Sequence, residues 1–427
     1  MPLIGRSFVN VNWSYGHPTS KAWVRKLVQD GFDGIRLDAF CGATGDGNWA
    51  DNPTSIDFNL DAGPRWSVVM DQLVADRKGL ILVLNGGPKN NAAWQSATGM
   101  ADPTIQAAGG ARPADNRAWR HHANAVPVMG RVWKSVIDYC AGRYAAAGLS
   151  PSQYMAVQLG NEPYGAVDPT TDAGQWNLHC NRHCSDANYN LVTYTDAWGL
   201  TRIAAPMDGY MGALSPVTAL ATLGTWWGTS ITNGILNLAA VAAPPTWFQY
   251  FEPSHHNYNS IHLGGRTGRR EVADQMAQFF EVARAKIDTV AAWQGKPIHV
   301  TEYGGPPLWL GLYADGRGVV SSQLRSDDLW GACIVAIKDR LMSLNRGGTT
   351  ALYRAYNDDA SHDSDTTLQS GLILSTGVPT KAAAWIVRNY GRTRWDGGGG
   401  TPPPNPPFSG GAWRADVNSF TGPIGLS

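Results

Sequence analysis

Short apolar runs of strand length alternate along the chain with stretches that have the spacing of amphipathic helices. The strand candidates lie at residues 7–13, 33–40, 79–86, 154–163, 202–210, 246–258, 296–304 and 349–358. The helical stretches lie at residues 21–31, 65–79, 126–148, 189–200, 271–293, 326–344 and 379–391. Glycines that suit helix C-caps, Gly31 and Gly148, close two of these stretches.

This alternation predicts the fold class. Eight strands alternating with helices are the pattern of an α/β protein with a (β/α)8 TIM barrel, here with long βα loops. An open doubly wound sheet shows the same alternation, but no G-x-G-x-x-G or P-loop motif follows a strand. We therefore expect one catalytic barrel over residues 1–394.

The C-terminal segment, residues 395–427, differs in composition from the rest of the chain. It contains DGGGGTPPPNPP at residues 396–407, a glycine and then proline tract that reads as a linker. The last twenty residues are too few for a second domain, so we expect a tail or a truncated module there.

Composition excludes several function classes. Hydrophobic residues make up 43% of the 427 residues and charged residues 16%, which is enough for a full core. Lys plus Arg and Asp plus Glu both number 34, so net charge gives no argument for nucleic acid or an anionic membrane. The most apolar stretch, residues 234–245, is too short to span a bilayer. We expect a monomer that binds neither nucleic acid nor membrane.

The N-terminus and the cysteines bear on the compartment. Residues 1–6 (MPLIGR) do not form a signal peptide, so either the chain acts without Sec export or a leader is absent from this sequence. Five cysteines are an odd number and imply no complete disulfide framework. The 18 Trp and 15 Tyr residues can fill a core, and they also suit stacking on sugar rings.

Two strand candidates end in a glutamate. Residues 158–164 read QLGNEPY and residues 298–305 read IHVTEYGG. Reactive groups of a (β/α)8 barrel sit at the C-terminal ends of its strands. Glu162 at the end of the fourth strand and Glu302 at the end of the seventh are therefore expected to face each other. Glycosidic bond cleavage uses such a pair of carboxyl groups.

These motifs resemble the clan A glycoside hydrolases, retaining (β/α)8 enzymes such as the family 5 endoglucanases and mannanases. The resemblance implies that Glu162 is the acid/base and Glu302 the nucleophile, with carboxyl groups roughly 5–5.5 Å apart. It also implies that Asn161 bonds the 2-hydroxyl group of the sugar.

Arg36 lies inside an otherwise apolar strand, GIRLDAF, where a guanidinium needs a carboxylate partner. The resemblance implies that this arginine braces the nucleophile and keeps it ionised. A structural salt bridge with Asp38 or another acid is the alternative.

The sixth strand candidate ends in HHNY, residues 255–258. It resembles the His-x-Tyr pair of family 5, which implies that His256 binds a sugar hydroxyl and that Tyr258 donates to the nucleophile. Strand alternation allows only one of the two histidines to face the barrel lumen, so His255 is the alternative.

Further candidates for substrate binding are Asn85, Tyr303, Trp309 and Trp13. Asn85 ends the third strand, where family 5 members often carry a histidine, and this departure leaves the particular family open. Trp13 and Trp309 are stacking candidates, with a place in the core as the alternative for each. Tyr353 and its neighbours stand where the clan often has a tryptophan.

The segment HCNRHC, residues 179–184, allows three interpretations. Zinc ligation needs four ligands, which are cramped within six residues. A Cys180–Cys184 disulfide pinning the loop is favoured if the protein works outside the cell, and two free cysteines are the alternative. We expect no metal and no cofactor.

Together these features predict a retaining glycoside hydrolase, endo-acting on a β-linked polysaccharide or oligosaccharide. We expect it to be extracellular, either secreted or virion-associated. A non-catalytic carbohydrate-binding protein, such as a phage tail adhesin on a lapsed barrel, is the first alternative. The presence of both glutamates argues against this alternative, because a protein that only binds carbohydrate gains nothing from two facing acids. An amidohydrolase is the second alternative, and it lacks a coherent His/Asp metal set. The sequence does not name the sugar.

Overall fold

A computed structural model describes residues 5–11, 22–38, 66–84, 125–161, 178–206, 246–257, 287–304, 327–355 and 371–373, with residue 387 and isolated helical positions between 273 and 285. The labelled elements run in the order β1 (Ser7–Asn10), α1 (Ala22–Gly31), β2 (Gly34–Asp38), α2 (Trp66–Ala75), β3 (Gly79–Val83), α5 (Ala125–Ala146), α6 (Pro151–Tyr154), β4 (Met155–Gln158), α8 (Leu191–Asp196), β5 (Thr201–Ile203), η3 (Thr246–Tyr250), β6 (Ser254–Asn257), β7 (His299–Tyr303), α11 (Asp327–Leu344) and β8 (Thr350–Leu352).

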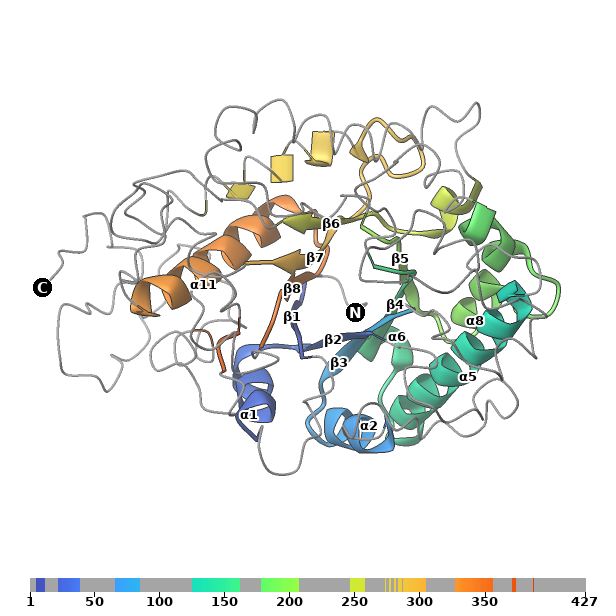
Figure 1. Ribbon diagram of the computed structural model, residues 1–427, viewed down its shortest axis with the longest axis horizontal. Helices are drawn as coiled ribbons and strands as arrows, with labels where there is room; N and C mark the ends of the chain where they lie inside the picture. Colours follow the sequence, from blue (N-terminus) through green and yellow to red (C-terminus); the bar gives the residue numbers. More distant parts are fainter. Residues whose placement is uncertain are drawn as a thin grey trace, which may run out of the picture.

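The eight strands form one parallel sheet in the order β5-β4-β3-β2-β1-β8-β7-β6. An isolated parallel bridge between Ile203 and Glu252 joins the two outer strands. There the Ala204 amide donates to the Glu252 carbonyl and the Glu252 amide donates to the Arg202 carbonyl, both at 2.8 Å. The strands thus surround a common centre with helices outside them (Figure 1), and the predicted (β/α)8 TIM barrel is confirmed.

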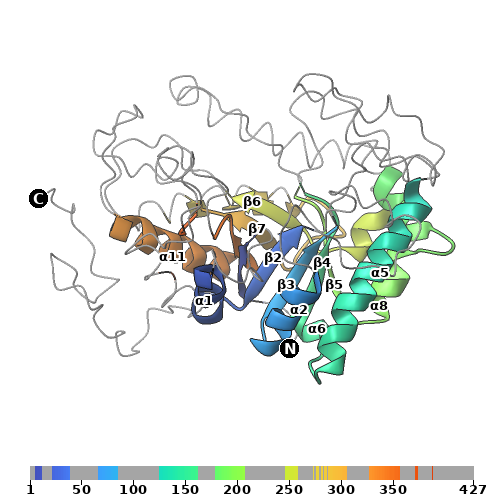
Figure 2. The same ribbon diagram turned by 60° about the horizontal axis from the view of Figure 1, so that its bottom comes forward.

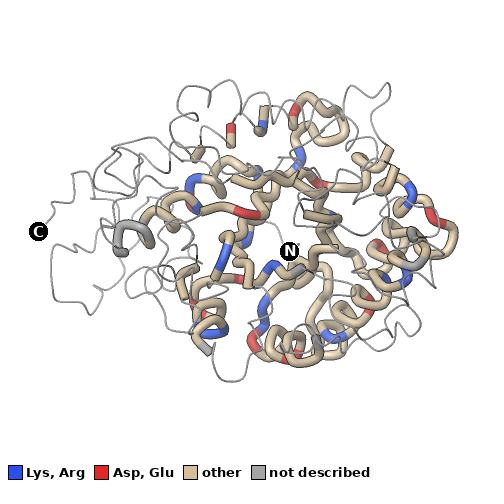
Figure 3. The backbone as a smooth tube through the Cα atoms, in the orientation of Figure 1, with Lys and Arg blue, Asp and Glu red and all other residues tan. Residues whose placement is uncertain are grey.

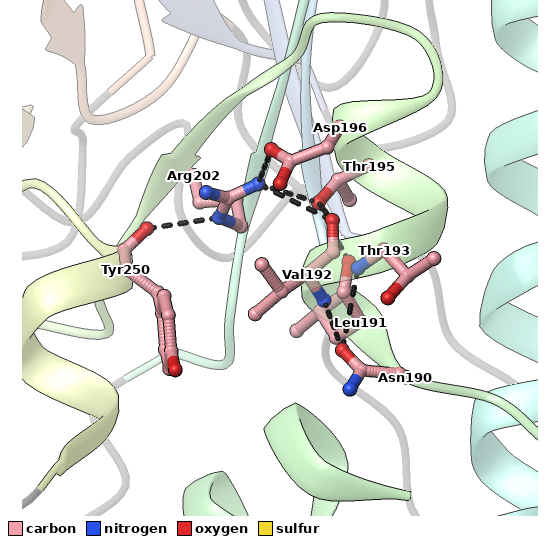
Figure 4. A network of polar contacts seen from close by, with 8 residues as sticks. All are labelled: Asn190, Leu191, Val192, Thr193, Thr195, Asp196, Arg202 and Tyr250. Atoms are coloured by element: carbon pink, nitrogen blue, oxygen red, sulfur yellow. Dashed lines mark hydrogen bonds and ion pairs between the residues drawn. The ribbon is translucent and has the colours of Figure 1, made fainter. Parts of the chain in front are cut away.

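Side chains reinforce this seam between β5 and β6 (Figure 4). The Arg202 guanidinium donates to the Tyr250 carbonyl at 2.8 Å and to the Thr195 hydroxyl at 2.9 Å, and it also pairs with Asp196. Asn190 caps α8 by accepting from the amides of residues 192 and 193. One arginine therefore ties β5 to α8 and to the 3-10 helix η3 that precedes β6.

The helices form an outer layer around the sheet, as the turned view shows (Figure 2). Their apolar faces pack on the outward side chains of the strands in one large buried cluster. Lys78, the residue before β3, is buried and donates to the carbonyls of Gln29 and Phe32 at 2.7 Å. It thereby satisfies carbonyl groups at the end of α1 that lack intrahelical partners.

The barrel interior is apolar towards the N-terminal ends of the strands. A separate buried cluster there comprises Phe8, Ile81, Ala156, Ile203 and Ala351. Gly34 packs against this cluster. A Cβ at this position would come within 2.4 Å of the Phe8 ring, so a larger residue does not fit here. Side chains therefore fill this end of the barrel, which leaves the opposite end for polar groups.

The largest departure from the predicted elements lies at residues 246–258. The first five residues of this run form η3, and among the described residues that follow, 254–257 form strand β6. Trp247 and Phe248 are fully buried in η3, and the Phe248 ring stacks on Trp293 with centroids 4.1 Å apart. An apolar run can thus be buried as a tight turn as well as a strand, and its length alone does not tell the two apart.

The favoured disulfide between Cys180 and Cys184 is wrong. Both thiols are free and buried, and residues 178–185 form one helical segment. Residues four apart on a helix have Cβ atoms about 5–6 Å apart, farther than a disulfide permits. Burial raises the pKa of Cys184 to about 12 and raises that of Cys180 as well. Both thiols are therefore protonated and serve as small apolar side chains.

Charged residues of both signs are scattered over the described chain (Figure 3). None of the helices in the described ranges combines the length and hydropathy that crossing a bilayer requires. The predicted tail at 395–427 and most of the predicted helix at 379–391 lie outside the described residues.

Candidate active site

Glu302 lies on β7, one residue before the C-terminal end of the strand, and only 6% of it is exposed. Its Oε1 accepts a hydrogen bond of 2.6 Å from Nη1 of Arg36, which is also buried. Arg36 comes from β2, so the contact crosses the barrel interior. The arginine predicted to brace Glu302 is therefore brought against that carboxylate.

Arg36 holds more than Glu302. Its Nη2 donates to Asn161 Oδ1 at 2.6 Å, and its Nη1 also lies 3.2 Å from Asn10 Oδ1. Its Nε donates to Gln158 Oε1 at 2.9 Å. All three guanidinium nitrogens are thus hydrogen-bonded. Their partners lie on β1, β4 and β7 and at Asn161, three residues after the end of β4. The guanidinium is fixed in position and in plane.

The second oxygen of Glu302 faces a histidine. His256 Nδ1 lies 3.5 Å from Glu302 Oε2, and His256 is 2% exposed. His255 points to the other side of β6, where its ring lies 6.1 Å from that of Phe280 and its Nε2 is 3.2 Å from Asn257 Oδ1. Of the two neighbouring histidines, His256 is therefore the one at the site.

The electrostatics of this cluster favour an ionised Glu302. A guanidinium keeps its positive charge at any ordinary pH, and a buried cation stabilises a carboxylate at hydrogen-bond distance. Breaking such a pair leaves a buried charge without compensation, at a cost of about 3–5 kcal/mol. The arrangement thus presents an anionic, oriented oxygen at the C-terminal end of the barrel, where it can act as a nucleophile or bind a cationic centre.

Asn161 follows β4 and is partly buried. Because its Oδ1 accepts from Arg36, its amide nitrogen is the group turned to other partners. Gly160, the residue before it, has a φ of 76°, a left-handed conformation that glycine adopts without strain. The chain therefore turns sharply between the end of β4 and Asn161.

Tyr303 has a different environment from its neighbour Glu302. Its side chain is 1% exposed and belongs to the apolar cluster between the sheet and the helices. Burial and the charge of Asp339 raise the pKa of its hydroxyl. These surroundings favour a packing role for Tyr303 over the predicted contact with substrate.

Several predicted site residues lie outside the described residues. They are Glu162, Asn85, Tyr258, Trp309 and Trp13. The predicted separation of the two carboxyl groups is therefore still a prediction. Strand β4 ends at Gln158, four residues before Glu162, whereas the sequence pattern carried that strand through Pro163.

Two polar residues of this cluster, Asn10 and Gln158, were not among the predicted site residues. Each follows an inward apolar residue by two positions, Phe8 on β1 and Ala156 on β4. Residues two apart on a strand share a face, so both side chains enter the lumen. The sequence feature that could have indicated these two residues is a polar residue within an apolar strand run.

Within the described ranges, His, Cys, Asp and Glu side chains nowhere gather in groups of three that could hold a metal ion. His179 and His183 lie close together, with ring centroids 4.5 Å apart, but they pack on Trp133 in the protein core.

Comparison with known proteins gives a likeness in structure. No protein-family profile and no curated sequence matches the chain. The endo-β-1,4-mannanase of Thermotoga petrophila superimposes with a TM-score of 0.50 at 13% identity, over 92% of this chain and 76% of that one. A second structure of an endo-1,4-β-D-mannanase from Thermotoga petrophila RKU-1 gives 0.49 at 13% identity, over 92% and 99%. A fungal β-1,4-galactanase gives 0.45 at 12% identity, over 89% and 98%. Structural neighbours of the chain are thus clan A (β/α)8 glycoside hydrolases, and the likeness is one of fold.

Proposed function

We propose that this protein is a retaining glycoside hydrolase in which Glu302 is the nucleophile and Glu162 the acid/base. The substrate is a polysaccharide or oligosaccharide, and the proposal includes endo-action on a β-linked chain and a place of action outside the cell. The observation that carries the proposal is the 2.6 Å contact between Arg36 and Glu302 at the C-terminal end of the barrel.

The contact supports this function because of where it lies and what it does. Catalytic groups of (β/α)8 barrels lie at the C-terminal ends of the strands. A nucleophilic carboxylate must be ionised and held still, and Arg36 supplies both a positive charge and a fixed direction. Oε2, the oxygen near His256, is our candidate for the attacking atom.

The proposed reaction has two steps. Glu302 bonds to the anomeric carbon while the bond to the leaving oxygen breaks and Glu162 gives its proton to that oxygen. A water molecule then gives a proton to Glu162 and bonds to the anomeric carbon, which releases Glu302. The two inversions restore the original anomeric configuration. In this scheme the amide of Asn161 donates to the sugar 2-hydroxyl.

The test separates the two carboxylates by the product that azide gives. With an activated aryl glycoside, Glu302→Gly leaves room for azide on the nucleophile's side, and we expect a glycosyl azide of inverted configuration. Glu162→Gly still forms the glycosyl-enzyme, and azide then gives a product of retained configuration. Glu252→Gly, which removes a carboxylate near the start of β6, is the matched control and should hydrolyse the substrate without forming an azide product.

A panel of glycans with product analysis comes first, since it identifies the substrate and the mode of cleavage. A wild-type protein that binds a glycan but releases no reducing sugar from any member of the panel supports the carbohydrate-binding alternative. Azide products with the two configurations exchanged would reverse the roles of Glu162 and Glu302.

A further inference from the structure

Gln158 is the last residue of β4 and is completely buried. Its Oε1 accepts from Arg36 Nε at 2.9 Å, and its Nε2 donates to the carbonyl of Gly160 at 2.9 Å. The side-chain amide is therefore used at both its acceptor and its donor end. One side of it touches the arginine of the site, and the other touches the backbone just before Asn161.

The contact with Arg36 sets the plane of the guanidinium. The Nη atoms serve Glu302, Asn10 and Asn161, so rotation of the planar group about its own axis would disturb all three contacts. Nε is the third nitrogen of the planar group, and Gln158 accepts its hydrogen. The amide oxygen thus fixes the direction in which Arg36 presents Nη1 to Glu302.

The contact with Gly160 sets the turn that follows β4. Gly160 is in the left-handed region with a φ of 76°, and its carbonyl is fixed by the Gln158 amide. Asn161 and Glu162 follow directly in the sequence. The same side chain therefore stabilises the support of Glu302 and the turn that leads to Glu162.

Only an amide of this length can do both. A carboxylate accepts hydrogen bonds but donates none, and it would compete with Glu302 for the charge of Arg36. A leucine would leave both Nε of Arg36 and the Gly160 carbonyl without this partner. We infer that Gln158 is a positioning residue that couples the supports of the two catalytic carboxylates, an inference that rests on the proposed hydrolase function.

The test uses Gln158→Glu and Gln158→Leu in the full chain, with the aryl glycoside that the wild type hydrolyses best. We expect Gln158→Leu to lower kcat by up to about 100-fold with a smaller change in KM, because the nucleophile is misplaced and binding is largely kept. In Gln158→Glu the added negative charge disfavours the ionised form of Glu302. The acid limb of the kcat/KM profile should then move to higher pH by about one unit.

Asn345 provides a matched control. It is a fully buried amide that donates to the Gly348 carbonyl at 2.6 Å and accepts from the Gly347 amide at 3.2 Å, at the turn between α11 and β8. Asn345→Leu should lower the melting temperature and leave the acid limb in place. If Gln158→Leu does not fold, the isosteric Gln158→Glu variant still reports on the pH profile.

The outcomes separate this inference from the function on which it rests. A wild type without hydrolase activity overturns the proposed function. An active wild type whose Gln158→Glu variant keeps the wild-type acid limb overturns the positioning role alone. A shifted limb in Gln158→Glu together with an unshifted limb in Asn345→Leu supports it.

Discussion

Strand β7 has a buried cluster of polar side chains at each end. We call these clusters the His299 group and the Glu302 group, and they differ in their partners. At the N-terminal end His299 Nε2 lies 2.6 Å from Glu252 Oε2, and His299 Nδ1 accepts from the Thr349 amide at 3.2 Å. At the other end Glu302 contacts Arg36 and His256.

The difference lies in what each group ties together. The His299 group joins residues that precede β6 and β8 to the start of β7, so it fixes three neighbouring strands at the closed end of the barrel. The Glu302 group also brings together strands that are not neighbours, since Arg36 on β2 contacts Glu302 on β7 and Gln158 on β4, around a charge on the lumen side. In barrels of this class the N-terminal face contributes to stability and the C-terminal face to catalysis. The two ends of β7 should therefore respond to mutation in opposite ways.

The largest effect is expected from Glu302→Gln. The change is isosteric but removes the negative charge, so no glycosyl-enzyme can form, and kcat on an activated aryl glycoside should fall by roughly 10⁴-fold or more. His299→Gln should keep kcat within about threefold, a difference below one kcal/mol. Steady-state kinetics on both variants measures the contrast. Equal losses in the two variants would contradict the division of roles along β7.

The second prediction concerns Arg36→Lys, which keeps the charge and loses the planar fork. An ammonium cannot reach Gln158, Asn161 and Glu302 together, so kcat/KM should fall about 100-fold. Arg25, which pairs with Asp76 through two hydrogen bonds on the outside of the barrel, is the matched control. Arg25→Lys should leave kcat/KM unchanged. An Arg36→Lys variant that keeps the wild-type kcat/KM would mean that charge alone, and not geometry, explains the role of Arg36.

At the N-terminal end of β7 we expect a loss of stability without a loss of activity. His299→Leu removes the hydrogen-bond partner of the Thr349 amide and of Glu252, so the free energy of unfolding should fall by about 1–3 kcal/mol. Urea denaturation measures this loss, and kcat of the folded fraction should be unchanged. A variant that is as stable as the wild type would show that the group does not hold the closed end together.

The smallest effect is expected at His183. This residue shows what burial does to a histidine ring that has no hydrogen-bond partner among the described residues. It is fully buried like His299, but neither of its ring nitrogens has a hydrogen-bond partner among the described residues. Its ring packs 4.3 Å from that of Trp133 and beside His179, with the protonated thiols of Cys180 and Cys184 on the same helical segment. Burial, and next the charge of His179, lower the pKa of His183 well below its ordinary value of 6.5.

The sign of the pH dependence follows from that shift. Below pH 6.5 the unfolded chain takes up a proton at His183 that the folded chain does not, so stability falls as the pH decreases. His183→Leu should flatten the melting temperature between pH 7 and pH 5, whereas His299→Leu should lower it at all pH values. Thermal unfolding at several pH values checks both. A His183→Leu variant with the wild-type slope would mean that other groups cause the acid sensitivity.

The sequence pattern was a good guide to the barrel because strands such as β1 and β3 contain short apolar runs and helices such as α1 have an apolar face. Strand order and the sites of Arg36 and Glu302 follow from counting these runs. The run around Trp247 was misassigned, because its burial in η3 needs the Trp293 ring, which comes from a distant part of the chain. Such tertiary packing is not visible in a local pattern.

The choice between His255 and His256 was open for a similar reason. Alternation gives two faces but not which face is inside, and the pairing of β6 with β7 is irregular between these two residues. Gln158 was missed because a single polar residue in an apolar strand does not show which partners its side chain meets. Its role depends on two contacts, one of them to a residue 122 positions away.

The seam between β5 and β6 has a consequence for how the barrel opens. In the described part of the chain the two strands meet through the single bridge between Ile203 and Glu252, whereas β2 and β3 pair along five residues. Amide protons at Ala204 and Glu252 should therefore exchange with solvent deuterium before those of β2 and β3. The barrel would thus open first between β5 and β6, while the Arg36 contacts, which join β1, β2, β4 and β7, remain formed.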